Sequence, residues 1–445
     1  DGKWVLPHFE KMLYDQALLA IAYLETFQAT GKIIYRETAR KILDYVLRDM
    51  TSEAGGFYSA EDADSEGEEG KYYLWPIEEL REILDQDELA FVQDYFHIKP
   101  QGNILNMGFP EGQNIFHRRG FEPLASDFPD EPGGIWQAQW NRIRRKLYKY
   151  RIKRMAPGKD TKVLTDWNGL MIAALALAGK LLAVDSYLAA AKKAADFIFG
   201  HLRQQDGHLY HRYFEGEAGI HGYLDDYAFL IWGLLELYEA TFLPAYMEKA
   251  IQLNQILFSD FEDKKKGGFY FTSKQNEPLM VRQKEAYDGA IPSGNSVALN
   301  NLLKLAHYTG QEHYNQKANA LISAFSRVIE QNPSAFAHFL TGIDFAFGPS
   351  SEVIIVGEQQ KEDTKKMLWA LQQTFLPRKI ILLHETNQEK RQINNLAHFD
   401  FPIKKLDGKA TAYICRDSTC MPPTTDRGKM LQLLDPKNRK GSMRT

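Results

Sequence analysis

A two-helix unit recurs along this chain, and the repeat constrains the fold more than any other feature of the sequence. In each copy, apolar residues at spacings of three and four predict two consecutive amphipathic helices. Copies that begin at intervals of roughly 60 residues are typical of a solenoid or a closed ring of hairpins. The predicted helix pairs are residues 10–30 with 34–50, 166–183 with 186–203, 222–241 with 244–261, and 293–308 with 312–330.

The interval between the first and second pairs is about twice as long as the others. We expect one further hairpin there, with a long glycine- and proline-rich insertion at about residues 97–134. The helix predicted at residues 135–154 is strongly basic, but its basic and aromatic residues match no recognised nucleic-acid-binding module. We interpret its charges as a solvated outer face.

The hydrophobic period changes after residue 350. Residues 353–356 and 379–383 are predicted strands, and residues 362–374 are a predicted helix between them, which together indicate a β-α-β unit. The turn after the first strand lacks the glycine triplet of a dinucleotide site. The predicted fold is therefore a mainly α, six-hairpin (α/α) toroid at residues 1–349, a small α/β domain at residues 350–430 and a polar tail at residues 431–445.

Composition narrows the classes of partner. The 445 residues are 44% hydrophobic and 12% aromatic, which indicates a folded globular protein. A net charge of -4 and a pI near 6.4 provide no overall basic surface for nucleic acid or an anionic membrane. The longest apolar stretch is shorter than the roughly 20 residues that span a bilayer.

Cys415 and Cys420 are the two cysteines of the chain. Such a low number of cysteines predicts a fold without disulfide bonds and a protein from a reducing compartment. We expect this compartment to be the cytosol. The chain begins at Asp1 and shows no secretory signal. We expect it to be part of a longer protein, in which upstream helices complete the ring.

Polar, acidic and aromatic residues recur where the first helix of each pair begins. In a ring of hairpins these helix starts converge on one rim, so their side chains share a cavity. Carboxylates facing each other in an aromatic cavity suit glycosidic chemistry, because one donates a proton while the other activates water or attacks. The candidate catalytic residues are Asp15, Asp225, Asp226, Glu285 and Asp288.

Ring-stacking and hydroxyl-binding side chains at the same helix starts are typical of a sugar site. Helix capping is the alternative explanation, since Asp and Ser at such positions also accept bonds from the free N–H groups of a first turn. The candidate ligand-binding residues are His8, Glu10, Tyr14, Trp167, Asn168, His221, Tyr227, Ser293 and Asn295. His8 and His221 could also serve epimerisation next to a carbonyl, although a structural role is the more common one for a single histidine.

The acidic run at residues 61–67 is similar to the opening of a calcium loop. Counted from Asp62, however, position twelve is Tyr73 instead of the bidentate glutamate that the ion requires. We therefore expect a pocket-lining or solvated acidic loop, no metal site and no cofactor. The spacing of Cys415 and Cys420 matches neither a Cys-x-x-Cys redox pair nor a complete zinc site.

Several longer motifs carry a family resemblance that covers nearly the whole chain. They are residues 7–15, 62–67, 72–75, 167–170, 225–228, 288–289, 292–296, 411–413 and 415–420. On these motifs the chain resembles the YyaL-type proteins, whose animal relative is a spermatogenesis-associated thioredoxin-like protein. This resemblance implies a six-hairpin glycosidase-like domain, akin to the N-acylglucosamine 2-epimerase fold, after an upstream thioredoxin-like domain that this chain lacks. It implies no catalytic roles.

Two hypotheses follow from the sequence. The leading one is a carbohydrate-binding or carbohydrate-processing toroid. Its small-molecule ligand would be bound by the acidic and aromatic residues named above. The rival is a non-catalytic scaffold that partners a thioredoxin-like domain in the full-length protein, since no complete catalytic signature is present.

Overall fold

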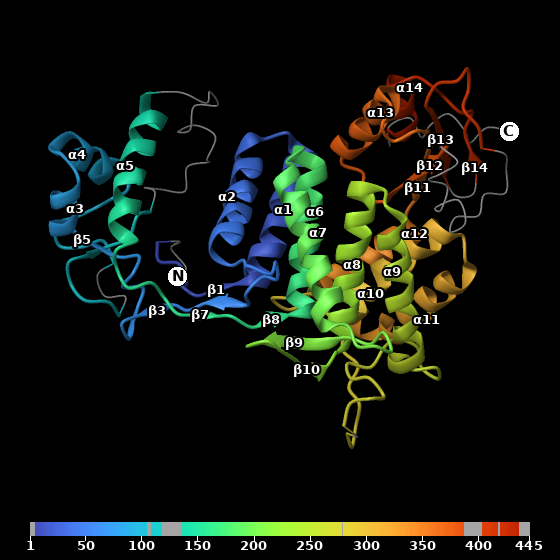
Figure 1. Ribbon diagram of the computed structural model, residues 1–445, viewed down its shortest axis with the longest axis horizontal. Helices are drawn as coiled ribbons and strands as arrows, with labels where there is room; N and C mark the ends of the chain where they lie inside the picture. The colour runs from blue at the N-terminus through green and yellow to red at the C-terminus, as the bar shows by residue number, and fades with distance from the viewer. Residues whose placement is uncertain are drawn as a thin grey trace. The chain divides into compact units, whose positions relative to one another are not determined.

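The computed structural model describes residues 5–104, 108–117, 135–277, 279–386, 403–416 and 419–435 (Figure 1). The chain divides into two compact units. The small unit comprises residues 1–12 and 59–161, and the helical unit comprises residues 13–58 and 162–445. This division differs from the predicted one. Residues 59–161 have hydrophobic clusters of their own, whereas the C-terminal sheet shares the core of the helices.

Within the described residues the small unit contains three helices, and the first two follow each other with a break between them. The break is at Asp85, whose side chain accepts a bond from Glu88 N (2.8 Å) while Glu88 Oε2 accepts from Asp85 N (3.2 Å). This reciprocal capping box starts a new helix. The helices are α3 (Ile77–Ile83), α4 (Gln86–Tyr95) and α5 (Ile135–Arg151).

The basic face of α5 is partly used inside the small unit, which corrects the expectation of a solvated face. Glu88 of α4 is fully buried, and its carboxylate pairs with Arg142 (3.0 Å) and Lys146 (2.6 Å) of α5. A buried carboxylate needs such partners to offset its lost hydration. The predicted insertion at residues 97–134 lies partly outside the described residues.

Short strands complete the small unit. Within the acidic run, β3 (Asp64–Ser65) and β4 (Glu68–Glu69) form a tight hairpin, and Gly67 takes a positive φ of 77° at its turn. The other pairings join β2 (Ala60–Glu61) to β1 (Lys11–Met12) and β7 (Lys159–Asp160), and β5 (Trp75–Pro76) to β6 (Gln113–Asn114).

The helical unit is a mainly α toroidal array of (α/α) hairpins with a small C-terminal sheet, which confirms the predicted fold class. The inner helices are α1 (Leu13–Thr30), α6 (Thr165–Leu182), α8 (Leu224–Thr241) and α10 (Gly294–Thr309). Their outer partners are α2 (Ile33–Asp49), α7 (Asp185–Phe197), α9 (Pro244–Ile256) and α11 (Glu312–Gln331).

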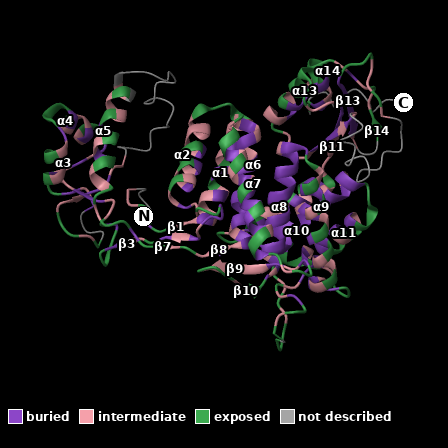
Figure 2. Ribbon diagram, in the orientation of Figure 1, coloured by how far each residue is buried: buried purple, intermediate pink, exposed green. Residues whose placement is uncertain are grey.

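Each inner helix packs against the next, in the order α1, α6, α8, α10 and then α12 (Ala337–Phe347), a helix that the sequence analysis did not predict. Figure 2 shows most of α8 and α10 as buried. The closest approach is between α6 and α8. A Cβ added to Gly169 would lie 2.5 Å from the Phe229 carbonyl carbon, and one added to Gly233 would lie 2.7 Å from the Gly169 oxygen. Two glycines thus allow the backbones to touch.

The C-terminal sheet has the strand order β12-β11-β13-β14. Strands β11 (Ser351–Gly357) and β12 (Lys379–Glu385) are parallel and are connected through α13 (Glu362–Gln373), which confirms the β-α-β unit. Strand β13 (Thr411–Arg416) pairs antiparallel with β11 and with β14 (Thr419–Cys420). Helix α14 (Arg427–Leu434) includes the first residues of the predicted tail, and residues 436–445 lie outside the described residues.

Cys415 and Cys420 form a disulfide between β13 and β14, which corrects the expectation of a fold without one. They face each other in the register of the two strands. No helix within the described ranges is both long and apolar enough to cross a membrane.

The contact between α6 and α8 yields a stability prediction. We expect Gly169→Ala to lower the free energy of unfolding by about 1–3 kcal/mol, because the added methyl group must push the two backbones apart. Chemical denaturation would measure this change. Gly200→Ala is the matched control, since no atom lies within 4 Å of its added Cβ; equal effects of the two substitutions would contradict the close-packing explanation.

Candidate functional site

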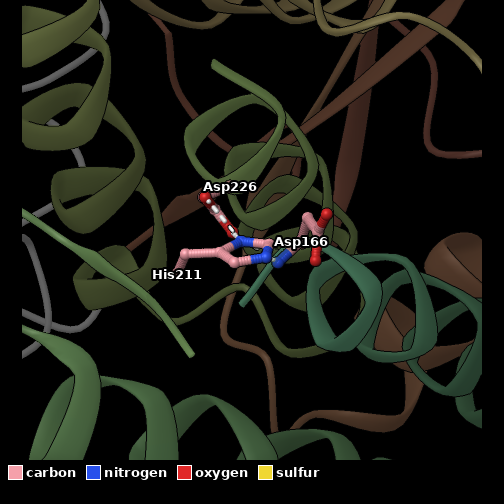
Figure 3. A group of neighbouring side chains, drawn as sticks. All are labelled: Asp166, His211 and Asp226. Carbon is pink, nitrogen blue, oxygen red and sulfur yellow. Dashed lines mark hydrogen bonds and ion pairs between the residues drawn. The ribbon is translucent and has the colours of Figure 1, made fainter. Parts of the chain in front are cut away.

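Three polar side chains from different elements meet at the starts of α6 and α8 (Figure 3). His211 comes from β9 (Tyr210–Phe214), which forms a hairpin with β10 (Glu217–His221) just before α8. Its Nδ1 lies 3.0 and 3.1 Å from the two carboxylate oxygens of Asp226. One ligand atom from each of Asp166, His211 and Asp226 lies within 4.8 Å of the others.

Asp226 holds this cluster together. It is fully buried in the first turn of α8, where its Oδ2 accepts from Tyr223 N (2.7 Å). Its Oδ1 also accepts from Asp166 N (3.0 Å) at the start of α6. A single carboxylate therefore satisfies free N–H groups at two helix starts, where the helix dipoles also favour negative charge.

The charges in the cluster depend on burial and on one another. Burial raises the pKa of Asp166 well above its usual range, and the negative charge of Asp226 adds to this, so Asp166 favours its neutral form. Burial opposes charge on His211, but the hydrogen bond and charge of Asp226 raise its pKa to about 9. His211 is thus an imidazolium at neutral pH.

His211 is a residue that the sequence analysis missed. It lies in the half-buried strand β9, and the β9–β10 hairpin was not predicted from the sequence. The signal was present as an aromatic-rich segment at residues 210–214, followed by Gly216 and by a helix start rich in acids. Asp166, His211 and Asp226 are residue types that bind metals, but the oxygens of Asp226 are already engaged by two backbone N–H groups and an imidazolium.

Asp225 lies beside a cavity of about 220 Å³ at the starts of α8 and α10. Glu285 and the rings of Phe271 and Tyr287 also line this cavity. Tyr223 stacks on Phe271 with ring centroids 4.9 Å apart and an interplanar angle of 10°. The cavity therefore combines two carboxyl groups with an aromatic wall.

Asp225 has an unusual protonation equilibrium. Burial raises its pKa to about 7, with the charges of Asp226 and Glu285 adding to the effect, while a bond from the Gly294 backbone N–H opposes it. A carboxylic acid that titrates near neutral pH can donate a proton and can take one back. Two of the predicted catalytic residues, Asp225 and Glu285, thus share one cavity.

Other predicted ligand-binding residues are used within the fold. Asn168 Oδ1 accepts from Phe57 N (2.8 Å), and its Nδ2 donates to Phe57 O (3.0 Å) and Leu164 O (2.8 Å). Asn295 Oδ1 likewise accepts from Phe269 N (2.8 Å), and its Nδ2 donates to Phe269 O (2.9 Å) and Glu285 O (2.8 Å). Each asparagine clamps the segment that closes the preceding hairpin.

Tyr227 holds the closing segment of the preceding hairpin in the same way in the third repeat, where its hydroxyl accepts from Leu209 N (2.9 Å). Both carboxylate oxygens of Asp288 also accept backbone hydrogen bonds. Its Oδ1 accepts from Ser293 N (2.9 Å), and its Oδ2 accepts from the N–H groups of His338 (2.8 Å) and Phe339 (3.0 Å) at the start of α12. Ser293 caps α10 through a bond from Ser296 N (3.1 Å). These contacts favour structural roles over the predicted ligand contacts.

The remaining candidates fall in three places. His8 and Glu10 belong to the small unit, where their side chains lie 3.3 Å apart, so they do not start an inner helix as expected. Asp15 and Tyr14 lie in the first turn of α1, and the Tyr14 ring meets the edge of Trp167 at 4.9 Å. His221 is exposed at the end of β10.

The chain is similar in sequence to proteins from human and Caenorhabditis elegans. No protein-family model matches it. It is 33% identical to human spermatogenesis-associated protein 20, over 98% of this chain and 59% of that protein, and 27% identical to an uncharacterised Caenorhabditis elegans protein, over 95% of this chain and 60% of that protein. The chain thus spans about three fifths of the length of these curated relatives.

Among solved structures, the chain is similar to a sugar epimerase from a ruminal bacterium, with a TM-score of 0.40 and 9% sequence identity. The similarity covers 73% of this chain and 76% of that one.

The asparagine clamps give a second prediction. We expect Asn168→Ala and Asn295→Ala each to lower the free energy of unfolding by about 2–4 kcal/mol, since both leave buried backbone groups of a phenylalanine without partners. Denaturation monitored by circular dichroism would measure this. Asn315→Ala on the outer helix α11 is the control, because its side chain makes an exposed contact with Glu312; clamp variants as stable as this control would refute the structural role.

The raised pKa of His211 predicts a pH-dependent stability. Its unfolded pKa is about 6.5, so the stabilising charge is fully present below that pH and is lost as pH rises towards about 9. We expect the free energy of unfolding to fall by up to about 3 kcal/mol over this window. His211→Gln should flatten the pH dependence, whereas His313→Gln should leave it intact. If the free energy of unfolding fell equally with pH in the unaltered protein and in both variants, His211 would not be the source of the pH dependence.

Proposed function

We propose that the helical unit binds a carbohydrate in the cavity beside Asp225 and that Asp225 serves there as a general acid. The observation that carries the proposal is a carboxyl group with a pKa of about 7 in an aromatic-walled cavity. Aromatic faces favour the C–H faces of sugar rings, and an acid with such a pKa can protonate a leaving oxygen near neutral pH.

Glu285 supplies the second carboxyl group that glycoside hydrolysis requires. Glu285 is an exposed residue that lines the same cavity as Asp225. The pair divides the acid role from the base or nucleophile role, as in other sites with two carboxyl groups in different environments. This arrangement supports hydrolase-like chemistry.

Epimerase-like chemistry by a neutral histidine base receives less support. His211 carries a proton at neutral pH and is held by Asp226, so it acts as a counter-ion. His221 is exposed and contacts Gln204, and His8 belongs to the small unit. His211 therefore provides no unprotonated imidazole at neutral pH.

The partner and compartment remain proposals. The curated relatives are longer than this chain, which leaves room for a partner domain; we propose a thioredoxin-like one, with the cytosol as the compartment. The scaffold hypothesis differs from the carbohydrate hypothesis in one respect that can be measured: it requires no ligand in the cavity beside Asp225.

A ligand and turnover screen tests the proposed function. We expect a panel of mono- and oligosaccharides to contain a compound that raises the melting temperature, and Asp225→Asn to reduce its turnover by about 10²- to 10⁴-fold, the usual contribution of a general acid. Glu285→Gln should cause a comparable loss. Asp196→Asn, an exposed substitution on α7, is the matched control. A panel without binding, or full activity in Asp225→Asn, would refute the proposal.

A further inference from the structure

A second cavity, of about 110 Å³, lies where the inner helices end. In Figure 1 the hairpin β9–β10 is at one end of the helices, and the sheet of β11, β12 and β13 is at the other. The second cavity is at the sheet end, since residues of β12 and of the segment after α13 line it. It is therefore separate from the cavity beside Asp225, which lies at the helix starts.

Four charged side chains form a buried network in the wall of this cavity. Lys180 Nζ donates to Glu236 Oε2 (2.7 Å) and Glu239 Oε2 (2.8 Å), and Lys304 Nζ donates to Glu236 Oε1 (2.9 Å). The fourth carboxylate oxygen, Glu239 Oε1, accepts from the hydroxyl of Tyr308 (2.6 Å). Every oxygen of the two carboxylates therefore has a donor from the protein.

Lys379 is the lysine in the cavity wall that lacks a carboxylate partner. Its Nζ donates to the backbone oxygens of Leu371 and Thr374, at the end of α13, and to no carboxylate of the described residues. An ammonium group has three N–H donors, so one remains after these two bonds. Burial lowers the pKa of Lys379 to about 8, because the charges of Glu239 and Glu236 offset the lost hydration only in part.

Several hydrogen-bond donors in the wall have no partner among the described residues. Lys304 keeps two ammonium donors beyond its bond to Glu236, Lys379 keeps one, and Trp232 contributes an indole N–H. We infer that this cavity is a binding site for a small organic carboxylate, whose oxygens accept from Lys379 and Lys304 and whose apolar part lies against Trp232.

Size and charge define the ligand further. The cavity is small, at about 110 Å³, which favours a carboxylate of a few carbons as the ligand. Glu25 is the exposed carboxyl group that lines the cavity from α1. Its negative charge opposes an entering anion, so its removal should strengthen binding.

Calorimetric titration of the whole chain with pyruvate and with acetate tests the inference, with glycerol as the neutral probe. We expect carboxylate binding, at least tenfold weaker binding in Lys379→Met, and tighter binding in Glu25→Gln. Lys366→Met is the matched control, because this lysine is exposed on α13 in an ion pair with Glu362. Its affinity should equal that of the unaltered protein.

The absence of carboxylate binding, or equal affinity in Lys379→Met and the unaltered protein, would overturn the inference. If Lys379→Met does not fold, nuclear magnetic resonance of the lysine side chains in the unaltered protein decides. Saturating pyruvate should raise the midpoint of the Lys379 titration, and an unchanged midpoint would contradict the site. Neither measurement depends on Asp225, so the result is independent of the proposed function.

Discussion

Carboxylates that bridge the starts of neighbouring inner helices are the constraint on which this fold depends. Asp226 of α8 accepts from the backbone at the start of α6, Asp225 accepts from Gly294 at the start of α10, and Asp288 accepts from two N–H groups at the start of α12. Each acid satisfies donors that a helix start leaves free and places negative charge at a positive dipole end. Because the acceptor belongs to a neighbouring repeat, the same bonds that cap each helix also fix the order of the array.

This constraint also determines which acid is available for chemistry. Asp226 and Asp288 use both oxygens on backbone donors, so a ligand could reach them only by displacing structural bonds. Asp225 is engaged by one backbone N–H and borders the cavity beside Phe271. The fixed negative charge of Asp226 next to it favours its protonated form. The structural acid therefore favours the protonated form of the acid that faces the cavity, and the proposed function depends on that form.

The sequence predicted the repeating part of the fold well because helical periodicity is a local property. The four hairpins and the β-α-β unit agree with the structure within a few residues. It predicted the roles of the recurring polar residues less well. Asn168, Tyr227 and Asn295 look like ligand-binding residues by position, but each bonds to the segment that closes the preceding hairpin, about 20 to 110 residues earlier in the chain. A contact of that kind depends on packing between repeats, which periodicity does not contain. His211 was missed for the same reason, since only the paired β9–β10 hairpin brings it to Asp226.

The charges of the inner helices differ between their two ends, and this difference separates the two cavities. At the starts, carboxylates complement the positive dipole ends, and the pocket there gains an acid that can hold a proton. Towards the ends, Lys180 and Lys304 approach the negative dipole ends and neutralise Glu236. Lys379 comes from the C-terminal sheet, and its ammonium group bonds to backbone oxygens at the end of α13 instead of to a carboxylate. The C-terminal sheet thus adds a positive charge beside the network of Lys180, Lys304, Glu236 and Glu239. It does so at the end of the helices that lies away from the cavity beside Asp225.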